Sequence, residues 1–184
     1  MTIVQISAKQ ITLAAKILRA GGAVVYPTDT AYALGGRFDH LAVRKKIMQI
    51  KGRRDQKFTL IAASRQQVEQ FFSLNVAQKK LAKQAWPGAL SIVVSSRSAV
   101  RVPANSIARR LAQLAGAPLI ATSANISGRP ALYSARAVTK EFARRRHQPD
   151  LILDAGRLQK TKPSTIVKVV RGKVLVLRQG AVKL

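Results

Sequence analysis

The sequence predicts an α/β fold, a twisted sheet of mixed parallel and antiparallel strands with flanking helices. Short apolar runs rich in β-branched residues, which are typical of buried strands, mix irregularly with amphipathic segments of helical period. This irregular order argues against a regular doubly wound sheet. The 184 residues are 47% hydrophobic, which is enough for a sizeable core, and they predict one domain spanning 1–184.

The first elements follow from caps, apolar faces and chain breakers. Ser7 is a good N-cap for a helix with an apolar face, and Gly21-Gly22 end that helix. Residues 23–26 predict a buried strand, which Pro27 ends because proline has no N–H to donate. Asp39 is expected to cap a second helix. The inward face of this helix is expected to hold Leu41, Val43, Ile47 and Ile50.

The rest of the chain continues the mixture of short strands and helices. Strands are expected at 58–63, 90–94, 100–102, 118–122 and 151–154. A hairpin of two further strands, 165–170 and 173–177, is expected to turn around Gly172. Helices are expected at 66–72 and 76–86, after the N-cap Asn105, and at 134–146, where the helix is basic.

The charge is strongly unbalanced, because 33 Lys and Arg stand against seven Asp and Glu, a net charge of +26 at pH 7. Such a chain attracts polyanions, and nucleic acid is the first candidate, bound through phosphate contacts that salt weakens. An anionic membrane is a weaker candidate because no basic amphipathic anchor stands apart from the globular pattern. The alternative is that the basic residues are simply solvated side chains on the protein surface.

Several classes of protein are disfavoured. The absence of cysteine excludes disulfides, a thiol nucleophile and cysteine-ligated metal. His40 and His147 have no partners at ligand spacing, so no protein-bound metal is expected. Residues 1–5 do not resemble a signal peptide, and no apolar run approaches the roughly 20 residues of a membrane span, so a cytoplasmic protein without membrane contact is expected.

Four short segments are candidates for chemistry. The polar residues Thr28, Asp29 and Thr30, followed by Gly35-Gly36, form a binding lip or an ordinary strand–turn. Lys51-Gly52-Arg53 has two cations that can hold one phosphate chain, although such a pattern also arises by chance in so basic a chain. The segment 122–128, TSANISG, follows an apolar strand, as in a ligand crevice or a capped turn. Residues 163–165 with 178–180 form a weaker candidate, with a surface turn as the alternative.

Two nucleotide-binding fingerprints are missing, because the chain has neither a G-x-x-x-x-G-K-[ST] loop nor a G-x-G-x-x-G segment. No His or Cys is placed as a nucleophile–base pair. An enzyme of this composition would act through cations, hydroxyls and backbone amides. Phosphoryl or nucleotidyl transfer to a nucleophile of the substrate suits such a site.

Five separated motifs together resemble the YrdC-like family over roughly 21–180. They are YPTDTAYALG, IKGR, WPGALS, RVP followed by ATSANISG, and PSTIV followed by RQG. The resemblance implies a twisted mixed sheet around a concave basic cavity. For the short single-domain members it implies a nucleotidyltransferase that makes threonylcarbamoyl-AMP and pyrophosphate from L-threonine, bicarbonate and ATP with Mg²⁺, without a bound organic cofactor. It also implies RNA (tRNA or double-stranded) and tRNA-modification proteins as partners.

The resemblance also assigns roles to residues. The catalytic tetrad is Lys51, Arg53, Ser123 and Asn125. These four, with Lys57 and Arg178, are implied to bind the nucleotide. The expected contacts to threonine are Thr30, Tyr32, Arg101, Ser164 and Thr165, with Tyr32 and Leu34 as apolar walls.

Some residues depart from the family pattern. Ala33 replaces a glycine, Arg54 a proline, and Ala131 a serine of longer members. The YALG segment and the strand at 58–63 also resemble the YciO paralogues, which lack the full tetrad. The alternative is therefore a non-catalytic or differently specific YciO-like paralogue that binds double-stranded RNA or tRNA. The intact tetrad favours the enzyme.

Overall fold

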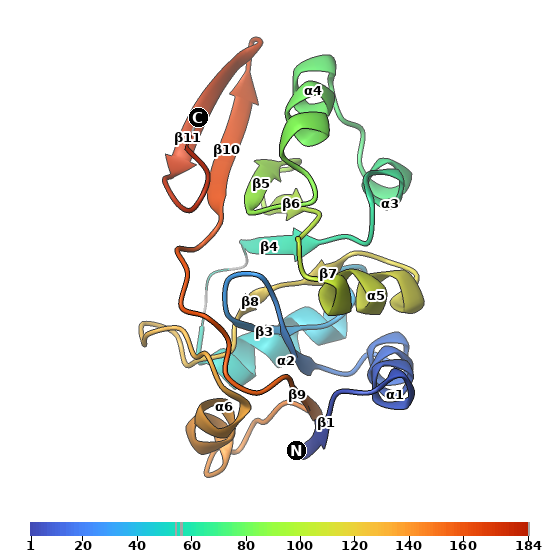
Figure 1. The fold of residues 1–184 in the computed structure, drawn as a ribbon, viewed down its shortest axis with the longest axis vertical. Coiled ribbons are helices and arrows are strands. Elements are labelled where there is room, and N and C mark those ends of the chain that lie inside the picture. Colours follow the sequence, from blue (N-terminus) through green and yellow to red (C-terminus); the bar gives the residue numbers. More distant parts are fainter. Residues whose placement is uncertain (54, 56, 184) are drawn as a thin grey trace.

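A computed structural model describes residues 1–53, 55 and 57–183 (Figure 1), so Arg54 lies outside the described residues. Their strands form two sheets, both with parallel and antiparallel neighbours, which confirms the mixed α/β class. One sheet has the order β1 (Thr2–Gln5), β9 (Leu151–Asp154), β2 (Val24–Pro27), β3 (Tyr32–Gly35), β8 (Thr122–Ser123). The other has the order β11 (Lys173–Arg178), β10 (Thr165–Val170), β5 (Leu90–Val93), β6 (Ser98–Arg101), β4 (Phe58–Ile61), β7 (Leu119–Ile120).

Helices flank both sheets, and the hairpin β10–β11 projects from one end of the molecule (Figure 1). The described helices are α1 (Ala8–Arg19), α2 (Leu41–Lys51), α3 (Arg65–Phe71), α4 (Val76–Ala85), α5 (Ser106–Ala115) and α6 (Ala135–Phe142). The expected caps at Ser7 and Asn105 are confirmed, because each side chain accepts a backbone N–H of the first helical turn. No helix of the described residues is long and apolar enough to cross a membrane.

The start of α2 differs from the expectation. Its N-cap is His40, and the carboxylate of Asp39 instead accepts two hydrogen bonds from the Arg37 guanidinium, at 3.0 and 2.6 Å. The guanidinium offers the carboxylate two parallel charge-assisted hydrogen bonds, so Asp39 pairs with Arg37 and does not cap the helix. Leu41, expected inward, is 75% exposed because it lies on the first turn, beyond the core, whereas the other three inward residues are confirmed as buried.

Two other boundaries were wrong. The basic helix begins after Ser134 as expected but ends at Phe142 with Ala143 as its C-cap, so Arg144, Arg145 and Arg146 lie outside it. The strand expected at 118–122 is divided into β7 and β8, because the chain passes from one sheet to the other at Ala121. There the Ala121 N–H donates to Thr59 of β4, and the Ala124 N–H donates to Tyr32 of β3.

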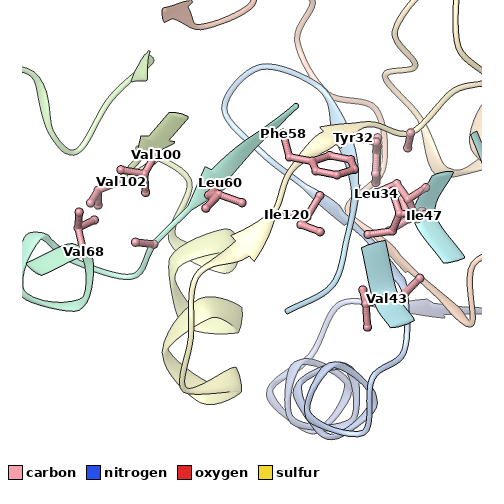
Figure 2. Packing of buried hydrophobic residues seen from close by; sticks show 14 of the residues in the cluster. Tyr32, Leu34, Val43, Ile47, Phe58, Leu60, Val68, Val100, Val102 and Ile120 are labelled. Carbon is pink, nitrogen blue, oxygen red and sulfur yellow. The ribbon is translucent and has the colours of Figure 1, made fainter. Parts of the chain in front are cut away.

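The core runs without interruption from one sheet to the other (Figure 2). Leu60 and Ile120 are paired neighbours in the larger sheet, and Ile120 in turn lies beside Leu34 and Ile47. Gly35 permits this approach, because a Cβ at this position would overlap the carbonyl oxygen of Ile120. The backbones of β3 and β7 therefore fix the separation of the two sheets.

Candidate functional site

A cavity of about 1020 Å³ opens between the two sheets. Eight of the eleven residues expected at the site line it: Thr30, Tyr32, Arg53, Lys57, Arg101, Ser123, Ser164 and Arg178. Arg97 and Lys168 add two more cations, and the described lining residues include no Asp or Glu. The lining of this cavity therefore favours an anionic ligand.

Arg101 and Thr30 meet at one wall of the cavity. The Arg101 guanidinium is almost fully buried, and its Nη1 lies 2.8 Å from Asp29 Oδ2 while its Nη2 donates to Thr30 Oγ1 at 3.3 Å. Asp29 Oδ2 also accepts the N–H of Ala104 at 3.2 Å. Asp29 thus sets the orientation of the arginine, a role that was not predicted from the sequence. A usable signal was that Asp29 is one of only seven acidic residues in a strongly basic chain.

The turn that carries these residues is held from both sides. Thr28 Oγ1 accepts the N–H groups of Thr30 and Ala31 and donates to the Ala31 carbonyl. Thr161, in the segment that crosses from β9 to β10, lies within 3.1 and 3.2 Å of the carbonyl oxygens of Asp29 and Thr30 and donates to them. Thr161 also lines the cavity and was not expected from the sequence.

Arg178 and Ser164 form the neighbouring wall. Arg178 Nη2 donates to the Ser164 carbonyl at 2.7 Å and to its hydroxyl at 3.1 Å, and that hydroxyl lies 3.1 Å from Ser91 Oγ. Burial, and then the nearby charge of Arg101, lowers the pKa of Arg178. Two cations that destabilise each other in this way favour a bound anion between them.

Thr165 is not brought into the cavity. Its side chain is buried, accepts the N–H groups of Gly180 and Val182, and donates to the Val182 carbonyl at 2.6 Å. In this structure it therefore ties the C-terminal segment to the start of β10.

Arg53 lines the cavity, together with Lys57 and Ser123. Its Nη2 donates to Asp55 Oδ2 at 2.8 Å and to the Lys57 carbonyl at 2.7 Å, and its guanidinium lies over the Phe58 ring. The Lys57 N–H, and then Arg53, hold the pKa of Asp55 below its usual value. The arginine is thus paired with an exposed carboxylate that an incoming anion can replace.

Lys51 and Asn125, the other two members of the tetrad, are not among the residues that line the cavity. Lys51 Nζ donates to the carbonyl oxygens of Ser123 and Asn125, at 2.6 and 2.8 Å. Burial, and then the charge of Arg53, lowers the pKa of Lys51 to about 8. Asn125 Nδ2 donates to the carbonyls of Ile126 and Arg129, and its Oδ1 is buried without a partner among the described residues.

Tyr32 is among the residues that line the cavity, although its side chain is fully buried. Its hydroxyl donates to the Gly156 carbonyl and accepts the Ala155 N–H, both at 2.8 Å. Burial raises the pKa of this phenol, so it stays neutral. Leu34, the second expected wall residue, is fully buried and lies in the core rather than in the cavity lining.

Residues 16–180 match a family described as telomere recombination, which unites Sua5, YciO and YrdC. The chain is 34% identical over 191 residues to the threonylcarbamoyl-AMP synthase of Pyrococcus abyssi, covering 95% of this chain and 55% of that protein. It is 35% identical over 179 residues to the protein of the same name from Psychromonas ingrahamii, covering 88% and 93%. The chain thus spans about half the length of the first relative and nearly all of the second.

Solved structures show the same fold. The crystal structure of P. abyssi Sua5 complexed with L-threonine matches with a TM-score of 0.85 and 33% identity, covering 97% of this chain and 57% of that one. The crystal structure of E. coli YciO matches with a TM-score of 0.82 and 26% identity, covering 97% and 94%. The resemblance expected from the five motifs is confirmed.

Proposed function

This chain belongs to the Sua5/YciO/YrdC family, and on that premise we propose that it is a threonylcarbamoyl-AMP synthase. It would act as a nucleotidyltransferase that makes threonylcarbamoyl-AMP and pyrophosphate from L-threonine, bicarbonate and ATP. Two relatives carry the synthase name, and a similar structure was solved with L-threonine. The observation that carries the proposal is the cavity itself, whose lining brings Thr30 and Arg101 together with the cations Arg53 and Lys57.

Threonine would bind at the wall formed by Arg101 and Arg178. Arg101 is fixed by Asp29 through Nη1, so its Nη2, beside Thr30 Oγ1, is the group we assign to the substrate carboxylate. Ser164 and Thr30 supply hydroxyls that can bond the hydroxyl of threonine, and Tyr32, whose side chain is fully buried, would shape this part of the cavity. Thr165 would act indirectly, by holding the C-terminal segment next to Ser164.

ATP would place its phosphates at Arg53 and Lys57, with Ser123 and Arg178 as further contacts. Lys51 and Asn125 would support this site by ordering the residues around Ser123. Mg²⁺ would enter with the nucleotide as part of the substrate. Among the residues that the structure describes, no group of three or more His, Cys, Asp or Glu lies together.

The chemistry needs no nucleophile from the protein. The threonine amine attacks bicarbonate, which forms the C–N bond of N-carboxythreonine and releases water. A carboxylate oxygen of this product then attacks the α-phosphorus of ATP, and the bond to the leaving pyrophosphate breaks. The site residues position the two reactants and neutralise negative charge, which are the main contributions in such transfers.

The product would be consumed in forming threonylcarbamoyladenosine in tRNA, in the cytoplasm. RNA, as tRNA or double-stranded RNA, and tRNA-modification proteins are therefore proposed partners. The +26 charge supports an interaction with RNA.

The deciding experiment measures pyrophosphate release with ATP and Mg²⁺ while threonine and bicarbonate are omitted in turn. The proposal requires release only when both are present, and threonylcarbamoyl-AMP as the product. Release without threonine, or no release at all, would refute it. RNA binding by a chain inactive in this assay would favour the YciO-like alternative.

A further inference from the structure

Residues 123–129 begin at the end of β8, lead toward α6 and carry Ser123 and Asn125; we name them the serine–asparagine loop. Two charged side chains of opposite sign hold this loop. Lys51, at the end of α2, donates to the carbonyl oxygens of Ser123 and Asn125. Glu141, from α6, accepts the Ile126 N–H at 3.0 Å through Oε1 and the Arg129 guanidinium at 3.1 Å through Oε2.

We propose that Glu141 is a positioning residue for the proposed reaction, which holds the serine–asparagine loop in the geometry that presents Ser123 to the cavity. The inference rests on the proposed function but concerns a residue outside the tetrad and outside the cavity lining. It assigns the carboxylate two effects. Glu141 fixes the loop through the Ile126 N–H, and its nearby negative charge favours the ammonium form of Lys51.

The burial of these groups supports the assignment. Lys51 is 3% exposed, and the partners of its ammonium are neutral carbonyls, while the nearby charge of Arg53 is unfavourable. The Glu141 side chain is only 12% exposed and is one of seven acidic residues in the chain. Arg129, its ionic partner, is 61% exposed and therefore offsets little of its charge at Lys51.

The charge of Lys51 links this geometry to pH. Its pKa of about 8 reflects burial first and Arg53 second, and the charge of Glu141 acts in the opposite direction by raising it. Lys51 thus holds the two carbonyls as an ammonium below that pH and loses its charge above it. Removal of the carboxylate lowers the pKa further, so the alkaline limit of turnover moves to lower pH.

The test compares Glu141→Gln with wild type in the pyrophosphate assay. Glutamine keeps an oxygen for the Ile126 N–H and removes the charge. We expect kcat to fall by up to about 100-fold, because a neutral amide holds the Ile126 N–H more weakly than a carboxylate and lets Ser123 shift, and the alkaline limb of its pH profile to move to lower pH. The KM for threonine stays unchanged because the proposed threonine contacts lie on other elements. Glu69→Gln is the matched control, since Glu69 is half exposed and 4.0 Å from Lys79.

A second measurement does not depend on activity. The titration of Lys51 is followed by NMR with ¹³Cε-labelled lysine, and its signal is assigned by its loss in Lys51→Met. We expect a lower pKa in Glu141→Gln than in wild type, and a pKa close to that of wild type in Glu141→Asp, which keeps the charge. Thermal melting verifies that each variant is folded.

Several results would overturn the inference. An unchanged kcat and pH profile in folded Glu141→Gln would do so, as would an unaltered Lys51 titration. If Glu141→Gln does not fold, Glu141→Asp decides, because a shortened carboxylate must lower kcat while the alkaline limb stays in place. If wild type releases no pyrophosphate, the proposed function fails by itself, and the Lys51 titration still decides whether Glu141 controls the charge of Lys51.

Discussion

Three arginines in the cavity lining already donate to oxygen atoms of the protein. Arg101 pairs with Asp29, Arg53 pairs with Asp55, and Arg178 donates to the carbonyl of Ser164. The two carboxylates differ in exposure, because the Asp29 side chain is 15% exposed and the Asp55 side chain is 56% exposed. The buried pair therefore fixes the geometry of its arginine, whereas the exposed pair can exchange.

Arg101→Ala is expected to raise the KM for threonine roughly ten- to hundred-fold, because a charge-assisted contact of about 1.5–3 kcal/mol is lost. Steady-state kinetics with varied threonine measure this change, and Arg110→Ala on the surface of α5 is the charge-matched control. Valine, which lacks the hydroxyl, should be rejected more strongly than serine, which lacks only the methyl. A threonine KM that does not change in Arg101→Ala would show that the pocket is misassigned.

Asp55→Asn is expected to lower the KM for ATP by a few-fold, because the nucleotide no longer competes with the Asp55 carboxylate for Arg53. The effect is small because the aspartate is largely exposed. Titrations of ATP at saturating threonine measure it. A raised KM would instead mean that Asp55 helps to orient Arg53 for binding.

At the scale of elements, the contact between β3 and β7 determines the separation of the sheets and hence the shape of the cavity. Gly35→Ala would place a methyl group against the Ile120 carbonyl. Overpacking of this kind costs about 1–3 kcal/mol, which lowers Tm by roughly 2–12 °C in a chain of this length. Calorimetry tests this expectation, and a wild-type Tm would mean that the two strands can separate at no cost.

The elements that the sequence predicted well depend on local chemistry. Ser7 and Asn105 cap helices through side chains that reach the first turn, and the hairpin around Gly172 has its turn signal in the sequence itself. In contrast, β1 and β3 were missed. Strand β1 is mostly exposed and is paired only with β9, about 150 residues away, and β3 exists through its pairing with β2 and β8.

The candidate site shows the same division. Motifs brought eight of eleven expected residues to one cavity, yet the Arg101–Asp29 pair joins residues 72 positions apart, for which no local pattern exists. The contact of Lys51 with phosphate stays a prediction, and the structure shows its ammonium on backbone carbonyls. These carbonyl contacts depend on the burial of Lys51, which is a property of the assembled fold.

At the scale of the whole molecule, the chain has two basic segments, 44–46 in α2 and 144–146 after α6, and Lys46 of the first forms an ion pair with Asp150 at 2.6 Å. Lys45, Arg144, Arg145 and Arg146 remain exposed. We expect RNA affinity to fall linearly with salt on a log–log plot, and replacement of the three arginines by glutamine to reduce the slope by roughly 0.9 per cation lost. Filter binding at several salt concentrations measures the RNA affinity and this slope. An affinity that does not change with salt would mean that the basic residues are solvated surface side chains and do not contact RNA.

The Arg53–Asp55 pair makes the cavity comparable to an ion-exchange resin charged with its own counter-ion. This counter-ion is tethered to the chain, so its effective concentration beside the arginine is constant and high. A small anion such as chloride or inorganic phosphate has to displace it with a single contact, whereas ATP brings several groups at once. Buffer anions should therefore inhibit weakly, and the buried Arg101–Asp29 pair stays in place throughout the exchange.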